Sequence, residues 1–313
     1  MTEPQSFDDA EYVRTPAPRP GQPGGAEGGG VADDRGPAGQ TRAGAPLPPL
    51  ESPLPTGRRR TRRRVNEDET GSPAESTTAD PSPFDLGDPG ADAAVLCLHG
   101  LTGTPYEVRS LGEALAASGL RALGPALPGH NDAPEVLARV SYTAWLDAAR
   151  ESVRGLRERH ERVYVVGLSM GGLLTLALAA EGRADAVAAV GTPLRLPAPV
   201  PHVVPFVKYL MPFLKKKVGS DIQDPAARAR HPSYPVMPLA SVHQLVRLQR
   251  WLAPQLPRIR VPTFVAHGVH DRTARPSDAG DLHAAIPGSE LLMLERSGHV
   301  VPVDYDAPLL AER

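Results

Sequence analysis

One short segment constrains the fold of this chain more than any other: an apolar run that leads into a serine flanked by glycines. The run Val163–Val166 is followed by Gly167-Leu168-Ser169-Met170-Gly171-Gly172 and then by an apolar segment that continues to about Ala180. A strand, a sharp turn with serine at its apex and a helix together form a nucleophile elbow. Such a turn exposes the hydroxyl and is so crowded that its neighbours must be small. We therefore predict that Ser169 is a nucleophile at a strand-to-helix turn.

The segments on both sides of this turn alternate between short apolar runs and longer helical patterns. The other expected strands are Ala93–Leu98, Leu120–Gly124, Ala186–Val190, Pro262–Ala266 and Glu290–Leu294. Apolar strands that alternate with helices are typical of a mostly parallel central sheet with helices on both faces. The sequence therefore predicts the α/β class, with one folded domain at residues 91–313.

Two regions depart from this rhythm. Residues 193–255 are rich in proline with helical patches, and we interpret them as a small cap insertion over one end of the sheet. Residues 1–90 contain 15 prolines and 13 glycines and few aromatic side chains. Such a segment cannot bury enough apolar surface to offset the entropy lost on ordering. We therefore predict a disordered tail over residues 1–90.

Charge and cysteine content limit the expected partners and compartment. The formal net charge is −2, so bulk electrostatics favour no polyanion. The arginine run within 58–64 is followed by acidic residues at 67–69, and we interpret it as a solvated charge run rather than a nucleic-acid site. The single cysteine, Cys97, excludes an intrachain disulfide, and neither a secretion signal nor an 18-residue apolar run is found. We expect a cytoplasmic protein without a membrane span.

A serine nucleophile needs a base and an acid, which in this arrangement follow it along the chain, acid first. Asp271 comes shortly after the expected strand Pro262–Ala266, and His299 follows the expected strand Glu290–Leu294. Both would therefore lie at the carboxyl ends of strands. We predict that His299 takes the proton of Ser169 and that Asp271 fixes the imidazole tautomer and stabilises its protonated form.

A metal site is an alternative for part of this region, because His267, His270 and Asp271 form a His-x-x-His-Asp pattern. The pattern lies on a strand end and loop rather than on a helix face, and it lacks a third, separated ligand. We therefore expect neither a metal nor any other cofactor.

Two backbone amides should complete the site by binding the oxyanion of a tetrahedral intermediate. One is the amide of Met170, directly after the nucleophile. The other is the amide of Leu101, in the loop that follows the first of the listed apolar strands. Within that loop Thr104 is a candidate helix cap, with Pro105 in the first turn and Glu107 three residues beyond Thr104.

The chain from about Ala94 to Arg313 resembles bacterial carboxylesterases and monoacylglycerol lipases of the α/β-hydrolase superfamily. The resemblance implies the α/β-hydrolase fold, with Ser169, Asp271 and His299 as the triad and Leu101 and Met170 as the oxyanion donors. It is carried by His99-Gly100-Leu101-Thr102-Gly103-Thr104-Pro105, the Ser169 motif, Gly219-Ser220-Asp221, His270-Asp271, Ser297-Gly298-His299-Val300 and Asp304-Tyr305-Asp306. The chain departs from the family at Asn131, where glycine is usual.

We expect a serine hydrolase that cleaves small carboxylic esters, monoacylglycerols or short- to medium-chain acyl esters, through an acyl-enzyme. Two alternatives remain open: acyl transfer to an acceptor other than water on the same triad, and a non-catalytic protein that binds a ligand with this fold. The apolar segment 199–219 ends in lysines and could line an acyl pocket or make transient contact with a lipid interface.

Overall fold

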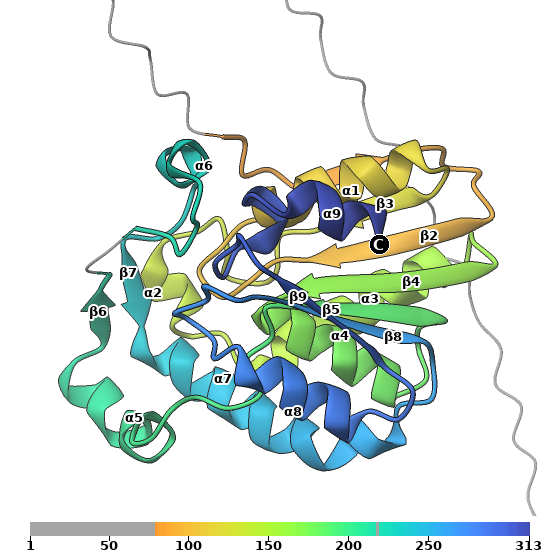
Figure 1. Ribbon diagram of the computed structural model, residues 1–313. Helices are drawn as coiled ribbons and strands as arrows, with labels where there is room; N and C mark the ends of the chain where they lie inside the picture. Colours follow the sequence, from red (N-terminus) through yellow and green to blue (C-terminus); the bar gives the residue numbers. More distant parts are fainter. Residues whose placement is uncertain (1–78, 217–218) are drawn as a thin grey trace, which may run out of the picture. The chain divides into compact units, whose positions relative to one another are not determined.

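The structure, a computed structural model, describes residues 79–216 and 219–313, and a seven-stranded sheet forms their centre (Figure 1). All neighbouring strands are parallel except the first, β1, which runs antiparallel to β3. The strand order is β1-β3-β2-β4-β5-β8-β9. The chain therefore places β3 on one side of β2 and then returns to add β4, β5, β8 and β9 in order on the other side. This confirms the predicted fold class. The strands are β1 (Phe84–Leu86), β2 (Ala93–Leu98), β3 (Arg121–Gly124), β4 (Arg162–Leu168), β5 (Ala186–Val190), β8 (Thr263–Gly268) and β9 (Glu290–Leu294).

Helices cover both faces of the sheet (Figure 1). One face carries α1 (Tyr106–Ala117) and α9 (Ala307–Glu312), which contact each other. The opposite face carries a larger layer, and the buried side chains fall into two clusters, one for each face. The larger layer consists of α3 (Tyr142–Arg157), α4 (Met170–Ala180), α7 (Leu239–Leu252) and α8 (Ser277–Ala285), and shorter helical segments are α2 (Pro134–Leu137), η1 (Ala253–Arg258) and η2 (Val301–Val303).

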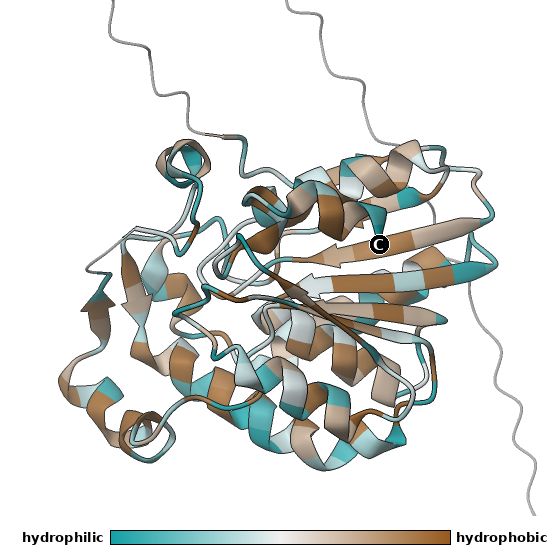
Figure 2. Cartoon of the chain, viewed as in Figure 1, coloured by the Kyte–Doolittle hydropathy of each residue, from teal (hydrophilic) through white to brown (hydrophobic). Residues whose placement is uncertain are grey.

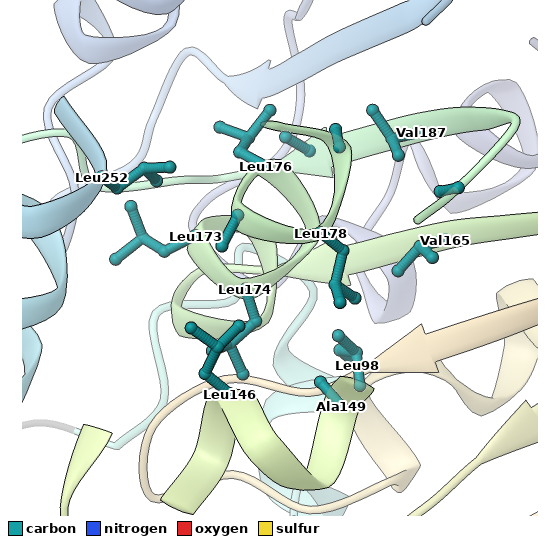
Figure 3. Packing of buried hydrophobic residues seen from close by; sticks show 14 of the residues in the cluster. Leu98, Leu146, Ala149, Val165, Leu173, Leu174, Leu176, Leu178, Val187 and Leu252 are labelled. Atoms are coloured by element: carbon teal, nitrogen blue, oxygen red, sulfur yellow. The ribbon is translucent and has the colours of Figure 1, made fainter. Parts of the chain in front are cut away.

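The centre of the larger layer is α4, which is apolar on every side and buried over nearly its whole length. Helices of this kind occur only where neighbours surround them. Figure 3 shows Leu173, Leu174, Leu176 and Leu178 of α4 pointing outward into side chains of α3, α7 and the sheet. Burial of each such leucine contributes roughly 1.5–3 kcal/mol relative to exposure. The helix that begins at Ser169 is therefore among the most firmly held elements of the fold.

The outer helices are amphipathic, in contrast to α4. On α3, Leu146 and Ala149 face the core while the opposite side carries charged residues, and Ser141 caps the first turn by accepting a hydrogen bond from the Ala144 amide at 3.2 Å. Figure 2 shows this pattern: the strands are mainly hydrophobic, whereas the outer helices mix hydrophilic and hydrophobic residues. No helix among the described residues has the length and apolar content needed to cross a bilayer.

The cap lies at the end of the sheet toward which the β2 and β4 arrows point (Figure 1). It consists of α5 (Val200–Leu210), α6 (Pro225–Arg230) and a two-stranded antiparallel sheet of β6 (Phe213–Lys215) and β7 (Val236–Pro238). The predicted insertion, 193–255, extends too far, because α7 packs on α3 and α4 and belongs to the domain core. The leucines of α7 recur with helical spacing, but the proline-rich sequence before α7 made this pattern hard to recognise in the sequence.

The predicted boundary of the tail is also wrong. Residues 79–90 are described, and they contain β1, which adds an antiparallel strand at the edge of the sheet. Only Phe84 of this three-residue strand is buried, so it leaves almost no pattern in the sequence. The rest of the predicted tail, including the arginine run, lies outside the described residues.

Candidate active site

The turn between β4 and α4 places Ser169 at the carboxyl end of a central strand. Its backbone has φ 58° and ψ −115°, a conformation that costs a non-glycine residue on the order of 1–3 kcal/mol. The turn is held in place by a hydrogen bond from the Ser169 amide to the Val190 carbonyl at 2.8 Å. A β-carbon on Gly167 would lie 2.2 Å from the Gly171 carbonyl oxygen, and one on Gly171 would lie 2.2 Å from that of Leu98. Glycine is therefore required at both positions for steric reasons.

Asp271 and His299, predicted from their places after two strands, lie in contact. Asp271 is in the loop after β8 and His299 in the loop after β9, and their side chains join through Oδ2 and Nδ1 at 2.7 Å. The other carboxylate oxygen accepts hydrogen bonds from the amides of Thr273 and Ala274, both at 2.8 Å. Asp271 is thus fixed by its own loop and fixes the imidazole in turn.

Electrostatics favour a charged Asp271 and a basic His299. Burial disfavours ionisation of Asp271, but the charge of His299, the close contact with His267 and the hydrogen bond that joins the carboxylate to His299 outweigh it and lower the pKa of the carboxyl. Burial likewise disfavours the imidazolium, but the charge and hydrogen bond of Asp271 raise the pKa of His299 above its usual value of 6.5. The imidazole is therefore a better proton acceptor than an isolated histidine.

Ser169 and His299 line one cavity of about 600 Å³, and each is 8% exposed. Within the described residues no hydrogen bond joins the serine hydroxyl to the imidazole. Such bonds are often long or poorly aligned without a substrate and tighten in the complex. The two groups therefore share a cavity wall at the carboxyl edge of a parallel sheet, where ligands of such sheets bind.

Three aspartates, of which Asp304 and Asp306 are buried, hold the loops that carry Asp271 and His299. Asp304 accepts hydrogen bonds from the Gln223 and Gly298 amides at 2.7 and 2.8 Å, and Asp306 accepts one from the Ser297 hydroxyl at 2.9 Å. The backbone carbonyl of Asp221 accepts a hydrogen bond from the His299 amide at 2.8 Å, and its Oδ2 accepts one from the Arg272 amide at 2.7 Å. These aspartates had entered only through the family resemblance. In the structure they anchor the loops that carry Asp271 and His299.

His267 is a second partner of Asp271 that sequence reasoning did not assign. It is fully buried at the end of β8, and its Nε2 lies 2.9 Å from Asp271 Oδ2. Its neighbour His270 is exposed. Within residues 79–216 and 219–313, no group of three or more histidine, cysteine or acidic side chains is arranged to hold a metal ion.

The two residues predicted to donate amides to an oxyanion lie next to or in the wall of this cavity in different ways. Leu101 lines it, and Met170 is the first residue of α4, next to Ser169. Neither amide donates a hydrogen bond to another group in the described part of the chain. The side chain of Met170 is buried in the core, so only its backbone can serve the site.

The residues after Leu101 differ from their predicted arrangement. Thr104 does not cap α1: its hydroxyl is buried and has no hydrogen-bond partner among the described residues, and Pro105 precedes the helix. Glu107, the expected partner in a capping pair, instead accepts the Gly100 amide at 2.8 Å. Burial disfavours its ionisation, but contacts with His231, whose Nε2 lies 3.2 Å away, lower the pKa of Glu107 to about 2. An ionised carboxylate is therefore buried behind the loop that carries Leu101.

The cavity has two chemically distinct parts. Apolar side chains come mainly from the cap and α7, whereas polar ones come from the loop after β2 and from the cap. The apolar lining includes Leu101, Leu196, Leu214, Met237, Val242 and Leu245, and the polar lining includes Thr102, Glu107, Lys216, His231 and Ser233. An amphiphilic ligand matches this division.

The chain is similar to known ester-hydrolysing proteins over most of its described length. Residues 89–304 match the family "serine aminopeptidase, S33". The thermostable monoacylglycerol lipase of Bacillus sp. (strain H-257) is 33% identical over 223 residues, which are 70% of this chain and 87% of that protein. The carboxylesterase of Bacillus subtilis (strain 168) is 26% identical over 233 residues, 74% of this chain and 93% of that protein.

Solved structures agree with these relatives. One from a study of the metagenome-derived lipolytic enzymes LipS and LipT has a TM-score of 0.70 and 29% identity and covers 76% of this chain and 96% of that one. The monoacylglycerol lipase of Paleococcus ferrophilus shares the fold, with a TM-score of 0.62, 16% identity and coverage of 74% and 95%. The chain therefore belongs to the serine aminopeptidase S33 family and is a carboxylic ester hydrolase with the α/β-hydrolase fold.

Proposed function

We propose that the chain hydrolyses carboxylic esters through an acyl-enzyme on Ser169. The observation that carries this proposal is the Asp271–His299 pair, joined at 2.7 Å, whose imidazole lines the same cavity as Ser169. A serine hydroxyl is a weak nucleophile at neutral pH and needs a base that a third group orients. Asp271 and His299 are such a pair, and the pKa of the imidazole is raised.

The reaction would proceed in two halves. In the first, His299 accepts the Ser169 proton while Oγ forms a bond to the carbonyl carbon, and the imidazolium then protonates the alkoxide as the bond between carbonyl carbon and ester oxygen breaks. In the second, His299 takes a proton from water as the water oxygen forms a bond to the acyl carbon, and the imidazolium then returns this proton to Ser169 Oγ as the bond between acyl carbon and Oγ breaks and the carboxylic acid leaves. The amides of Leu101 and Met170 would bind the oxyanion in both halves.

The preferred substrates would be monoacylglycerols or other esters of short to medium acyl chains. Two observations support this class: the cavity combines an apolar wall with a polar one, and a relative that is 33% identical is a monoacylglycerol lipase. The acyl chain would lie along the apolar lining, and the alcohol would face the hydroxyls and charges. Buried polar groups that pair with substrate hydroxyls discriminate strongly against analogues that lack them.

The outer surface of α5 would make transient contact with lipid aggregates that contain such substrates. Three large side chains there are strongly exposed: Phe206 at 73%, Tyr209 at 79% and Leu210 at 88%. An apolar cluster on a short cap helix can insert shallowly into an interface without crossing it.

The direct test compares wild type with Ser169→Ala on p-nitrophenyl esters and on monoacylglycerols of the same acyl length. The variant should lose at least about 10³-fold in kcat, because removal of a triad nucleophile leaves only the contributions of substrate binding and oxyanion stabilisation. Thermal unfolding provides the control for an intact fold. Wild-type rates in the Ser169→Ala protein would refute the acyl-enzyme, whereas equal rates on both ester types would refute the preference for monoacylglycerol.

A further inference from the structure

The loop that carries Leu101 has an unusual backbone at the next residue. Thr102 has φ 62°, in the left-handed region, which a β-branched residue rarely adopts. Its side chain is 1% exposed. Residues in such conformations persist only where the surrounding structure fixes them in several ways. The groups that fix Thr102 therefore also determine the direction of the amide that precedes it.

Two of these groups come from the cap, more than one hundred residues away in the sequence. The ammonium of Lys216 donates a hydrogen bond to Thr102 Oγ1 at 2.8 Å and another to Ser233 Oγ at 3.1 Å. The amide of Tyr234 donates to the Thr102 carbonyl at 3.3 Å. The cap thus contacts Thr102 at both its side chain and its backbone.

A third connection reaches the residue before Leu101. The Gly100 amide donates to Glu107, and the other oxygen of this carboxylate lies 3.2 Å from Nε2 of His231, which belongs to the cap. The His231 side chain is 2% exposed, and its Nδ1 lies 2.6 Å from the Ser220 hydroxyl. A β-carbon on Gly103 would lie 2.1 Å from the Glu107 carboxylate, so the loop closes tightly around this group. The cap therefore holds the loop on both sides of Leu101.

We infer that the cap insertion sets the conformation of the oxyanion loop, with Lys216 and the His231–Glu107 pair as positioning residues for the Leu101 amide. This inference rests on the proposed function, because it requires that Leu101 bind the oxyanion. Lys216 contacts no reacting atom: it acts through Thr102, and Glu107 acts through Gly100. The cap is on this account part of the catalytic apparatus as well as a wall of the acyl pocket.

The test is Lys216→Met in the full chain, with Lys216→Arg as the conservative variant and Lys208→Met as the matched control. Methionine keeps the length and packing of the side chain and removes its donors, and Lys208 is a lysine of the same cap whose contacts are His243 and Tyr209. We expect a loss of about tenfold in kcat for Lys216→Met with KM within about twofold, because small misplacements of a catalytic group reduce turnover rather than binding. Arginine should restore most of the rate, and Lys208→Met should match wild type.

Two further readouts separate positioning from substrate contact. The loss should be the same for p-nitrophenyl acetate and for a monoacylglycerol, and the affinity for a trifluoromethyl ketone, whose adduct carries an oxyanion, should fall by the same factor. Thr102→Val removes the acceptor and keeps the shape, so its effect should not add to that of Lys216→Met. An increase confined to KM, a loss confined to the monoacylglycerol, or an unchanged kcat would overturn the inference. If Ser169→Ala abolishes activity in the same assays, such a result leaves the proposed function intact.

Discussion

The turn at Ser169 and the cap line one cavity, but their conformations are held by different forces. The turn at Ser169 lies between β4 and α4, which are almost completely buried, and two glycines leave no room for side chains. The cap has short elements and large exposed apolar side chains, and individual polar contacts connect it to the rest of the site. Packing therefore fixes the proposed nucleophile, whereas a few hydrogen bonds fix the loop proposed to stabilise the oxyanion.

This difference has an energetic consequence. Apolar packing is spread over many contacts, so a change at one position reduces the stability of the whole domain before it changes the chemistry. A hydrogen bond between the cap and a catalytic loop affects the chemistry directly and contributes little to global stability. We therefore expect substitutions in the α4 core to lower stability with little change in kcat. Substitutions at the polar contacts of the cap should lower kcat with little change in stability.

The largest effect should come from a substitution of Asp271, in the loop after β8. Asp271→Asn should reduce kcat by roughly 10³- to 10⁴-fold, because the imidazole loses the group that fixes its tautomer. The proposed mechanism requires neutral His299, and Asp271 raises the pKa of that imidazole. Wild-type kcat/KM should therefore fall as the pH drops through a value above 6.5, and the residual activity of the variant should fall only at lower pH.

A pH–rate profile of both proteins measures this shift, with Asp281→Asn as a control on the exposed face of α8. If kcat/KM of Asp271→Asn falls at the same low pH as that of wild type, Asp271 is not the group that raises the pKa of the imidazole.

The next effect should be on stability alone, at the centre of the core. Leu176→Ala in α4 removes a fully buried side chain and should lower the free energy of unfolding by about 2–5 kcal/mol. Leu210→Ala, at a residue 88% exposed, should change it by less than about 0.5 kcal/mol. Urea unfolding measures both. A kcat of the folded Leu176→Ala protein far below wild type would show that packing and chemistry are not separable as described.

The smallest effect should come from the outer surface of the cap. Phe206→Ser with Leu210→Ser should leave stability and the rate on dissolved p-nitrophenyl acetate unchanged. It should lower the rate on monoacylglycerol presented in lipid vesicles by roughly three- to tenfold, because less apolar area enters the interface. A vesicle co-sedimentation assay measures binding in parallel. A double variant that binds the vesicles and hydrolyses vesicle-bound monoacylglycerol as well as wild type would refute the lipid contact.

The contrast between packed segments and single long-range polar contacts also explains which parts of the fold and the site could be predicted from the sequence. The strands β2 and β9 lie at the predicted residues, and Ser169, Asp271 and His299 follow strands as expected, because apolar runs and glycine turns are local signals. The edge strand β1 contains only one buried residue and leaves no such signal. Glu107 was read as part of a helix cap because its true partners, Gly100 and the distant His231, show no spacing that a sequence reveals.

The central claim is that Ser169 forms the covalent intermediate with His299 as its base. The most direct measurement is intact-mass and peptide-mapping spectrometry after reaction with a fluorophosphonate, which serine nucleophiles attack only when a base activates them. We expect one adduct per chain, located on Ser169, and labelling that slows greatly in His299→Ala. An adduct on another residue, or full activity after Ser169 has been labelled, would contradict the central claim.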